Sequence, residues 1–264
     1  MSDPSTIPSP VLYEELSPHI ALVTLNRPEK RNAVSPELAI ALEAAVRKSE
    51  ADANIRAVIL TSSVDKVFCA GADLQAIAEG RGAAMDTPLS GFAGFVYALR
   101  HKPWIAAVEG MALGGGFEII LACDMIVASE QAQFGLPEVK RGLIAGAGGT
   151  HRIATVLPRN IANEMMATGE PMTASRAHHF GLVNRVAPVG SALSAARELA
   201  DIIALNAPVA VKYALQAARQ SAAQPDGFGR TIVAERLGAL KLTEDFYEGP
   251  RAFVEKRAPV WTGR

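Results

Sequence analysis

The order of apolar and polar positions divides the first part of the chain into short elements. Residues 11–16 and 20–26 are strand-length runs separated by a short polar gap, which predicts a β-hairpin or meander. Residues 55–62 are almost continuously apolar, a pattern typical of a strand that is covered on both faces. Between them, a Ser-Pro-Glu sequence supplies an N-cap, a first-turn proline and an early acid, so we expect a helix over residues 35–51.

A second pattern, strand then glycine turn then helix, occurs twice in the middle of the chain. Residues 66–80 indicate a short strand, a tight turn at Gly71 and a helix. Residues 104–129 repeat that plan and add a further strand. A recurrence at about 45 residues favours a stack of similar ββα turns, each of which buries one face on the next. The predicted fold class is therefore α/β.

Towards its end the sequence has the pattern of helices alone. This part is rich in alanine, has helical periodicity, is interrupted at Pro208, and closes with a helix over residues 244–257. Its large apolar side chains, Phe253 among them, need partners on the core or on a neighbouring subunit. We therefore expect a mixed α/β core over residues 1–190 and a helical region over residues 191–264.

Composition narrows the classes of function. Of the 264 residues 20% are charged, below the roughly 25% usual in soluble proteins, which favours some surface buried against another subunit. The net charge of −1 provides no electrostatic footprint for nucleic acid. The N-terminus is polar and unlike a signal peptide, and no stretch approaches the roughly 20 apolar residues of a membrane span. Cys69 and Cys123 lie in apolar runs and indicate reduced thiols, so we expect a cytoplasmic protein without membrane contact.

Two glycine turns are the first candidates for chemistry. In "ALGGGFEII", residues 112–120, three glycines stand where the chain leaves a turn and enters a helix, and "CAGADL", residues 69–74, offers the same arrangement. Glycine lets another molecule approach the backbone closely, and the first N–H groups of a helix have no internal partners. Two such turns facing each other could clamp one oxyanion between the N–H groups of Ala72 and Gly115.

Two glutamates accompany these turns. Glu118 is expected on the first turn of its helix, and its neighbours Phe117, Ile119 and Ile120 predict partial burial and a raised pKa, as general acid–base catalysis requires. Glu138 follows 20 residues later, beside Pro137, which fixes the backbone.

With these features the ordered motifs resemble the crotonase (enoyl-CoA hydratase/isomerase) superfamily. They are "NRPEKRNA", "FCAGADL", "ALGGGFEI", "ACDMIVAS", "AQFGLPEVKRGLIAGAGGTHR" and "GLVNRV". The resemblance extends from about Val11 to Arg257 and implies a spiral of ββα turns, a C-terminal helical trimerisation region and acyl-CoA thioester substrates. In that family two backbone N–H groups bind the thioester oxygen, at positions that match Ala72 and Gly115. Its hydratases carry two glutamates, which match Glu118 and Glu138.

The resemblance also implies the residues that contact the substrate. Lys30 and Arg31 match positions near the CoA nucleotide, and Lys256 matches one that reaches it from a neighbouring subunit. Gln75 stands where a lysine is common, and Leu136 and Ala145 replace residues often seen as Gln and Pro, which affects acyl-chain preference. The remaining residues expected at the substrate or CoA site are Ala70, Gly71, Asp73, Leu74, Gly114, Leu136, Pro137 and Phe253.

The predicted function is that of an enoyl-CoA hydratase, a hydro-lyase that adds water reversibly to a 2-enoyl-CoA to give a 3-hydroxyacyl-CoA. Water addition needs a base for the water and a proton donor for Cα, which two carboxyls sharing one water can supply. Coenzyme A is then part of the substrate, no further cofactor or metal is expected, and the assembly is a homotrimer or a dimer of trimers. The alternatives are a carnitinyl-CoA dehydratase-like enzyme or an isomerase of the same fold, and a non-catalytic or RNA-binding relative.

Other motifs do not support a different class. The glycines of "GAGGTHR" lack the spacing of a dinucleotide-binding turn, and no GxSxG nucleophile elbow occurs. No HExxH or paired CxxC predicts a metal site. Adjacent His178 and His179 point to different sides of a predicted helix, so both are interpreted as structural residues.

Overall fold

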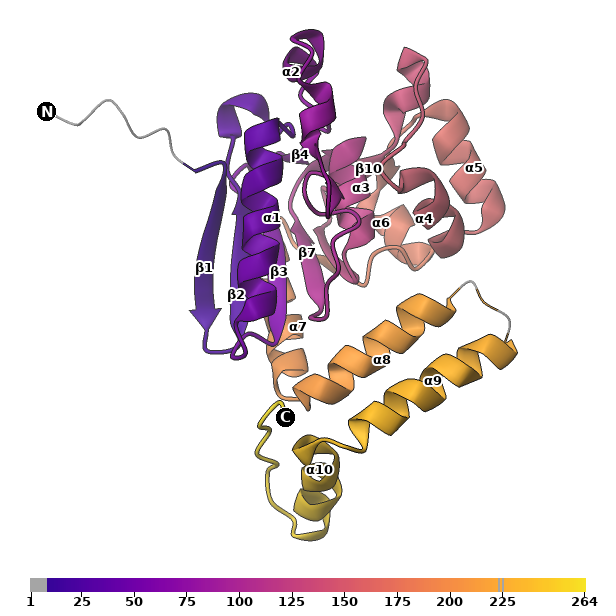
Figure 1. The fold of residues 1–264 in the computed structure, drawn as a ribbon. Helices are drawn as coiled ribbons and strands as arrows, with labels where there is room; N and C mark the ends of the chain where they lie inside the picture. Colours follow the sequence, from indigo (N-terminus) through magenta and orange to yellow (C-terminus); the bar gives the residue numbers. More distant parts are fainter. Residues whose placement is uncertain (1–8, 223, 225) are drawn as a thin grey trace, which may run out of the picture.

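Two sheets form the frame of the molecule in the computed structural model, which describes residues 9–264 except positions 223 and 225 (Figure 1). The larger has six strands in the order β1 (Val11–Ser17), β2 (Ile20–Leu25), β3 (Ala57–Ser62), β7 (Trp104–Val108), β9 (Met125–Ser129) and β12 (Arg185–Ala187). The smaller has the order β11 (Met172–Thr173), β10 (Gln133–Gly135), β8 (Met111–Leu113) and β4 (Val67–Cys69). A two-stranded ribbon joins β5 (Asp86–Thr87) to β6 (Gly91–Phe92).

The strands are placed as their sequence patterns predict. β1 and β2 pair antiparallel as the expected hairpin. From β2 to β12 every neighbouring pair of the six-stranded sheet is parallel. β3 and β7 are buried along almost their whole length. This agrees with the rule that parallel strands are covered on both faces and therefore have continuous apolar runs.

The expected spiral of ββα turns is confirmed. Each turn adds one strand to the six-stranded sheet and the next strand to the four-stranded sheet, as β3–β4, β7–β8 and β9–β10 do. The interval between turns is not constant, because β7 begins 47 residues after β3 and β9 begins only 21 residues after β7. The longer turn contains the β5–β6 ribbon, which the apolar pattern did not predict.

Ten α-helices among the described residues surround and connect the sheets. They are α1 (Pro36–Ala51), α2 (Leu74–Ala78), α3 (Gly115–Ala122), α4 (Gly149–Val156), α5 (Arg159–Thr168), α6 (Ala174–His179), α7 (Ala192–Ala204), α8 (Pro208–Ser221), α9 (Asp226–Leu240) and α10 (Glu244–Val254). Short 3₁₀ helices are η1 (Pro28–Lys30), η2 (Gly82–Met85) and η3 (Pro137–Arg141). Of the helices among the described residues, none is long and apolar enough to cross a membrane.

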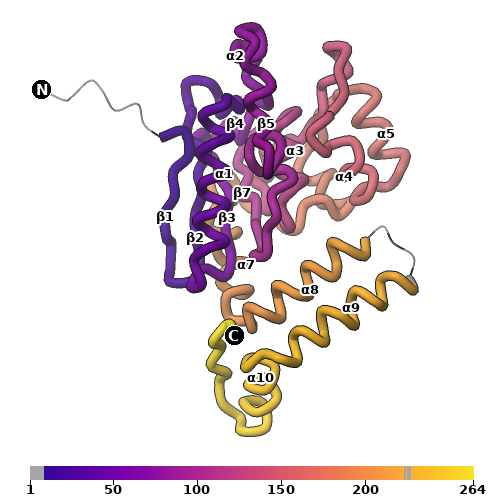
Figure 2. Tube along the Cα trace, viewed as in Figure 1, coloured from indigo at the N-terminus to yellow at the C-terminus, as the bar shows by residue number. Residues whose placement is uncertain are grey.

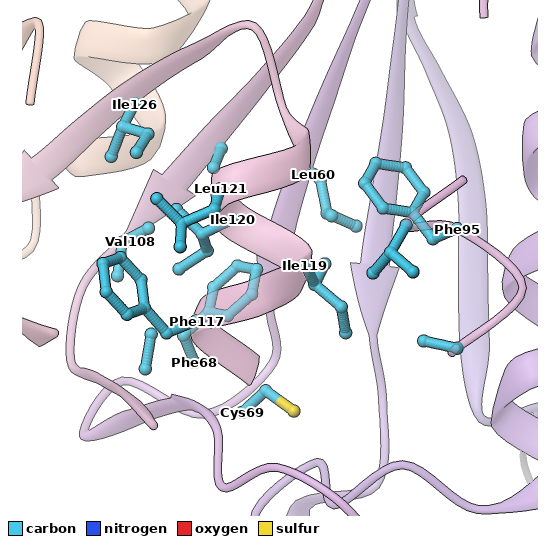
Figure 3. Close-up of a cluster of buried hydrophobic side chains, with 14 of the residues drawn as sticks. Leu60, Phe68, Cys69, Phe95, Val108, Phe117, Ile119, Ile120, Leu121 and Ile126 are labelled. Atoms are coloured by element: carbon cyan, nitrogen blue, oxygen red, sulfur yellow. The ribbon is translucent and has the colours of Figure 1, made fainter. Parts of the chain in front are cut away.

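Helix α3 lies in the hydrophobic core rather than on the surface. Phe117, Ile119 and Ile120 are fully buried, and they pack in one cluster with Phe68 and Leu60 of the two sheets (Figure 3). Apart from Glu118, α3 is apolar on every side, and a buried helix of this kind has no solvent face and no amphipathic stripe. Its N-terminus is consequently held rigidly by the surrounding packing.

Helix α7 covers the other face of the six-stranded sheet. Its buried face consists of alanines spaced four residues apart, namely Ala192, Ala196, Ala200 and Ala204. Ala196, Ala200 and Ala204 pack with Ile59 and Ile105 of the sheet. Small side chains on one helical face let the helix lie close to the strands.

Helices α8, α9 and α10 stand away from the sheets, with α8 and α9 side by side (Figure 1). Arg219 of α8 binds Asp124 at 2.5 Å and donates to the Arg100 carbonyl at 2.6 Å, which ties α8 to the core. α10 ends at Val254, three residues earlier than the predicted Arg257. Large apolar side chains are exposed on these helices and the chain after them, namely Phe228, Val233, Leu242, Tyr247, Phe253, Val254 and Val260.

Candidate active site

The contact between two strand-to-helix turns is the centre of the candidate site. One turn follows β4 and leads to α2, and the other follows β8 and leads to α3. Gly71 and Gly114 occupy the turns with φ of 98° and 54°, a conformation that side-chain-bearing residues rarely adopt. A Cβ on Gly71 would lie 3.3 Å from the Gly115 nitrogen and 3.1 Å from the Leu113 carbonyl oxygen. The two turns are therefore in backbone contact.

Close packing also explains the third glycine of "GGG". A Cβ on Gly116 would lie only 2.3 Å from the Cys69 carbonyl oxygen, a distance that no real side chain tolerates. Cys69 is fully buried, and burial raises the pKa of its thiol to about 12, so it is an inert packing residue. A larger residue at position 116 would push α3 away from β4 and separate the two turns.

The contact brings two backbone N–H groups together. A Cβ on Gly115 would lie 3.6 Å from the Ala72 nitrogen, so the Gly115 backbone lies close to that N–H. Neither the Ala72 nor the Gly115 N–H donates a hydrogen bond to another described residue. Gly115 is the first residue of α3, as predicted. The sequence predicts Ala72 at the start of α2, but this residue lies one residue before Asp73, the N-cap of that helix. Two free donors side by side are the geometry of an oxyanion hole.

Glu118 is placed by α3 one turn after these donors. The side chain is 4% exposed, and its Oε1 accepts the Gly149 N–H at 2.8 Å. Burial raises the pKa of the Glu118 carboxyl, as the apolar neighbours predict, and the charge of Glu138 raises it further. Gly149 belongs to the "GAGGTHR" segment. This segment forms part of the cavity wall and donates a hydrogen bond to Glu118.

Glu138 comes from η3 and faces the same region. Its Oε1 lies close to the turn between β8 and α3, since a Cβ on Gly114 would be 3.1 Å away. Its Oε2 is buried and has no hydrogen-bond partner among the described residues. Burial raises the pKa of this carboxyl too, with a smaller opposing effect of the Arg141 charge. A buried carboxyl oxygen without a partner is unusual in a folded protein and marks a place for a substrate or a water.

These groups line one cavity of about 430 Å³. Nine of the residues predicted at the site contribute to its wall, and they are Ala70, Gly71, Ala72, Leu74, Gly114, Gly115, Pro137, Glu118 and Glu138. The structure thus brings together the two predicted turns and both predicted acids from three separate segments of the chain, 70–74, 114–118 and 137–138.

Four predicted residues lie near the cavity without lining it. Asp73 binds Arg27 at 3.1 Å and caps α2 by accepting the Gln75 and Ala76 N–H groups, so its contacts are structural. Lys30 binds the side-chain oxygen of Gln75 at 3.1 Å, which keeps its ammonium beside α2. Arg31 is exposed in the turn after η1, and Leu136 is buried before η3.

Phe253 and Lys256 are far from the cavity of their own chain. They lie at the end of α10, which is at the opposite end of the molecule from α2 (Figures 1 and 2). Phe253 is 85% exposed, and Lys256 is exposed as well. In this structure neither residue reaches the cavity of its own chain.

The cavity also has a wall that the sequence did not predict. It includes Ile77, Asp86, Phe92, Arg141 and Ile144. Asp86 and Phe92 are paired partners in the β5–β6 ribbon, where each strand has two residues. Strands that short have no readable periodicity, so the sequence carried no signal for them.

The other candidate residues have structural roles. His178 makes a 2.8 Å hydrogen bond to the Val183 carbonyl, a partner that the sequence did not suggest, and the His179 ring stacks edge-to-face on Phe180. Cys123 is a free thiol, and burial raises its pKa to about 12. Within the described part of the chain, no group of three or more His, Cys, Asp or Glu residues could hold a metal ion.

Known proteins resemble this chain along nearly its whole length. Residues 15–264 match the family described as Enoyl-CoA hydratase/isomerase. A carnitinyl-CoA dehydratase of Salmonella typhi is 42% identical over 248 residues, which cover 92% of this chain and 94% of that protein. An enoyl-CoA hydratase structure from Mycobacterium tuberculosis H37Rv has a TM-score of 0.93 at 40% identity and covers 97% of this chain and 100% of that one. A carnitinyl-CoA hydratase structure from Mycobacterium avium, with the same coverage, has a TM-score of 0.76 at 43% identity.

The raised pKa of Glu118 predicts a pH-dependent cost in stability. An acid whose pKa is higher in the folded than in the unfolded chain binds more protons when folded, so stability falls as pH rises through that interval. Glu118→Gln removes this cost and still accepts the Gly149 N–H. At pH 8 we expect Glu118→Gln to have a higher midpoint of thermal unfolding than the unchanged protein. Below about pH 4.3, the pKa of glutamate in the unfolded chain, we expect the two midpoints to be equal.

Calorimetry at fixed protein concentration measures both midpoints. The control is Glu198→Gln, an exposed position on α7, which should change the free energy of unfolding by no more than about 0.5 kcal/mol. A Glu118→Gln midpoint at pH 8 equal to or below that of the unchanged protein would contradict the assigned burial cost.

Proposed function

The chain belongs to the enoyl-CoA hydratase/isomerase family, and from that premise we propose that it is an enoyl-CoA hydratase. The reaction is reversible addition of water across the Cα=Cβ bond of a 2-enoyl-CoA thioester. One observation carries the proposal: the buried Glu118 and the half-buried Glu138 line one cavity beside the Ala72 and Gly115 N–H groups, which have no partner among the described residues.

The two N–H groups bind the thioester oxygen in the proposed mechanism. When water attacks Cβ, electrons move through the double bond to the thioester carbonyl, whose oxygen becomes negative. The Ala72 and Gly115 donors stabilise that enolate, and because they are fixed by backbone packing they need no reorganisation. The rigid surroundings of α3 therefore contribute to the rate.

The two glutamates move the protons. One carboxylate takes a proton from the attacking water as its oxygen bonds to Cβ, and the other carboxyl gives a proton to Cα. Their pKa values favour such a division, since burial raises both and the charge of Glu138 raises that of Glu118 further. A proton transfer between the two carboxyls restores the starting state. No redox step occurs, so the reaction calls for no cofactor beyond the CoA of the substrate.

Dehydration of a carnitinyl-CoA is the second candidate. It is favoured by the relative of that name, which is 42% identical over 92% of this chain. Loss of water from a 3-hydroxyacyl thioester is the same reaction in reverse, so the same four groups would perform it. The acyl group, rather than the catalytic machinery, distinguishes the two candidates.

We also propose that α8–α10 form the contacts between copies of the chain in a homotrimer or a dimer of trimers. The support is the row of exposed apolar side chains on these helices and the distance of Phe253 and Lys256 from the cavity of their own chain. In such an assembly these two residues would reach the CoA of a neighbouring subunit, while Lys30 and Arg31 serve their own. Light scattering at micromolar concentration should give the mass of three or six chains, and a monomer would contradict the proposal.

Replacing each glutamate tests the proposed reaction. Glu118→Gln and Glu138→Gln keep the size and hydrogen-bonding capacity of the side chain and remove its titratable proton. Each alone should lower kcat for hydration of but-2-enoyl-CoA by about 10²–10⁴, and the double variant should be little worse, because both carboxyls serve one water. Loss of the enoyl-thioester absorbance measures the rate.

The KM for the same substrate should change less than kcat, since most of the CoA binds away from the two acids. Damage by Glu138→Gln alone would favour a one-acid isomerase mechanism instead. Near-normal hydration by both single variants would rule out the two-carboxylate mechanism.

Two substitutions at Gly115 isolate the oxyanion hole. Gly115→Pro removes the N–H, and proline is tolerated at the first position of a helix. A new Cβ at this position would also meet the Phe92 ring at 2.5 Å. Gly115→Ala adds the same Cβ and keeps the N–H, so it is the matched control.

Relative to Gly115→Ala, Gly115→Pro should lower kcat by about 10²–10³, the usual loss when one oxyanion donor is removed. Circular dichroism confirms that both variants are folded. Equal rates for two folded variants would show that the Gly115 N–H does not bind the oxyanion.

A further inference from the structure

We propose that Asp86 selects acyl-CoA thioesters whose acyl chain carries a bulky positive charge, such as a trimethylammonium group. The inference rests on the proposed function, because it assigns the acyl group that the same cavity accepts. It concerns the wall that is formed by the β5–β6 ribbon and not the four groups that perform the chemistry.

Asp86 is an uncompensated charge in the cavity wall. It lines the cavity with Glu118 and Glu138, and its carboxylate has no hydrogen bond or ion pair to any described residue. Arg141 is the one basic residue among the described residues of the wall. It follows Glu138 on η3 and lowers the pKa of the Glu138 carboxyl, and it makes no ion pair with Asp86.

The ribbon holds Asp86 in place from both sides. The preceding residue, Met85, is 2% exposed, and its carbonyl accepts the Ala93 N–H at 2.8 Å. The following residue, Thr87, is buried and donates its hydroxyl to Glu43 of α1 at 2.6 Å. Met85 and Thr87 are thus both buried, whereas Asp86 between them is exposed and lines the cavity.

An aromatic ring lies across the ribbon from Asp86. Phe92 is its paired residue, and the Phe92 ring reaches the first residue of α3, where a Cβ on Gly115 would meet it at 2.5 Å. A carboxylate and an aromatic ring both attract a cation, the ring through its electron-rich face. The ribbon thus has Phe92 beside the oxyanion donor Gly115 and Asp86 as the partner of Phe92 on the neighbouring strand.

The rest of the wall favours a quaternary ammonium over a primary one. Among the described lining residues, the side chains able to hydrogen-bond are Asp86, Glu118, Glu138 and Arg141 alone, and the others are apolar or glycine. A primary ammonium carries three N–H donors that need acceptors, whereas a trimethylammonium has none. Apolar contacts together with one carboxylate therefore suit the quaternary cation.

Binding of two matched thioesters tests the inference without turnover. The probes are 4-(trimethylammonio)butanoyl-CoA and its neutral isostere 5,5-dimethylhexanoyl-CoA, which differ only in nitrogen for carbon, and neither has a double bond to hydrate. Calorimetry gives Kd for the unchanged protein, for Asp86→Asn and for Glu79→Gln. Glu79 is an exposed acid after α2 that is not part of the wall, so its variant controls for the change in net charge.

We expect the unchanged protein and Glu79→Gln to bind the cation at least about tenfold more tightly than the isostere. Asp86→Asn should reduce that ratio by about tenfold, the scale of one charge contact in a partly solvated site. Its Kd for the isostere should change by less than about twofold, as expected when only a charge is removed.

An unchanged ratio in Asp86→Asn, or equal binding of the two probes by the unchanged protein, would overturn the inference. The proposed function is judged separately by hydration of but-2-enoyl-CoA. If the protein does not hydrate but-2-enoyl-CoA but its Kd ratio depends on Asp86, the hydratase is rejected and the cation site is retained. If it hydrates that substrate but the Kd ratio does not depend on Asp86, the cation site is rejected and the hydratase is retained.

Discussion

Backbone contact between the turn after β4 and the turn after β8 is the constraint on which the site depends. A Cβ on Gly116 would prevent the two turns from approaching, and Gly71 adopts a positive φ that other residues rarely tolerate. That approach leaves the N–H groups of Ala72 and Gly115 side by side and unpaired. Unpaired donors at a protein surface would normally bind water, but here they face a cavity whose shape is fixed by core packing.

The position of α3 turns this constraint into chemistry. Its apolar sides are buried between the sheets (Figure 3), so the helix cannot rotate to bring Glu118 into solvent. The carboxyl remains buried with a raised pKa, and Gly149 supplies one fixed hydrogen bond. Such a group destabilises the folded chain when it is ionised, a cost that is common where activity needs a strained or buried residue.

Different parts of the fold carry different parts of the proposed function. The sheets and α3 hold the oxyanion donors, whereas η3 and the β5–β6 ribbon come from irregular segments that shape the remaining wall. Irregular segments change with less effect on the core than strands do, so a conserved reaction and a variable acyl group can coexist on this architecture. The assignment of a cation to Asp86 follows that division.

The sequence by itself determined most of the elements and the candidate catalytic groups, since local signals are enough for both. Apolar runs identified β2, β3 and β7, the Ser-Pro-Glu start identified α1, and glycine turns beside acids identified Ala72, Gly115, Glu118 and Glu138. Only the tertiary structure decided which distant segments line the cavity, because a two-residue strand such as β5 has no period and Asp86 no local partner. It also decided that Asp73 caps α2, and that Phe253 and Lys256 lie far from their own cavity, because pairing and distance are properties of packed elements rather than of neighbouring residues.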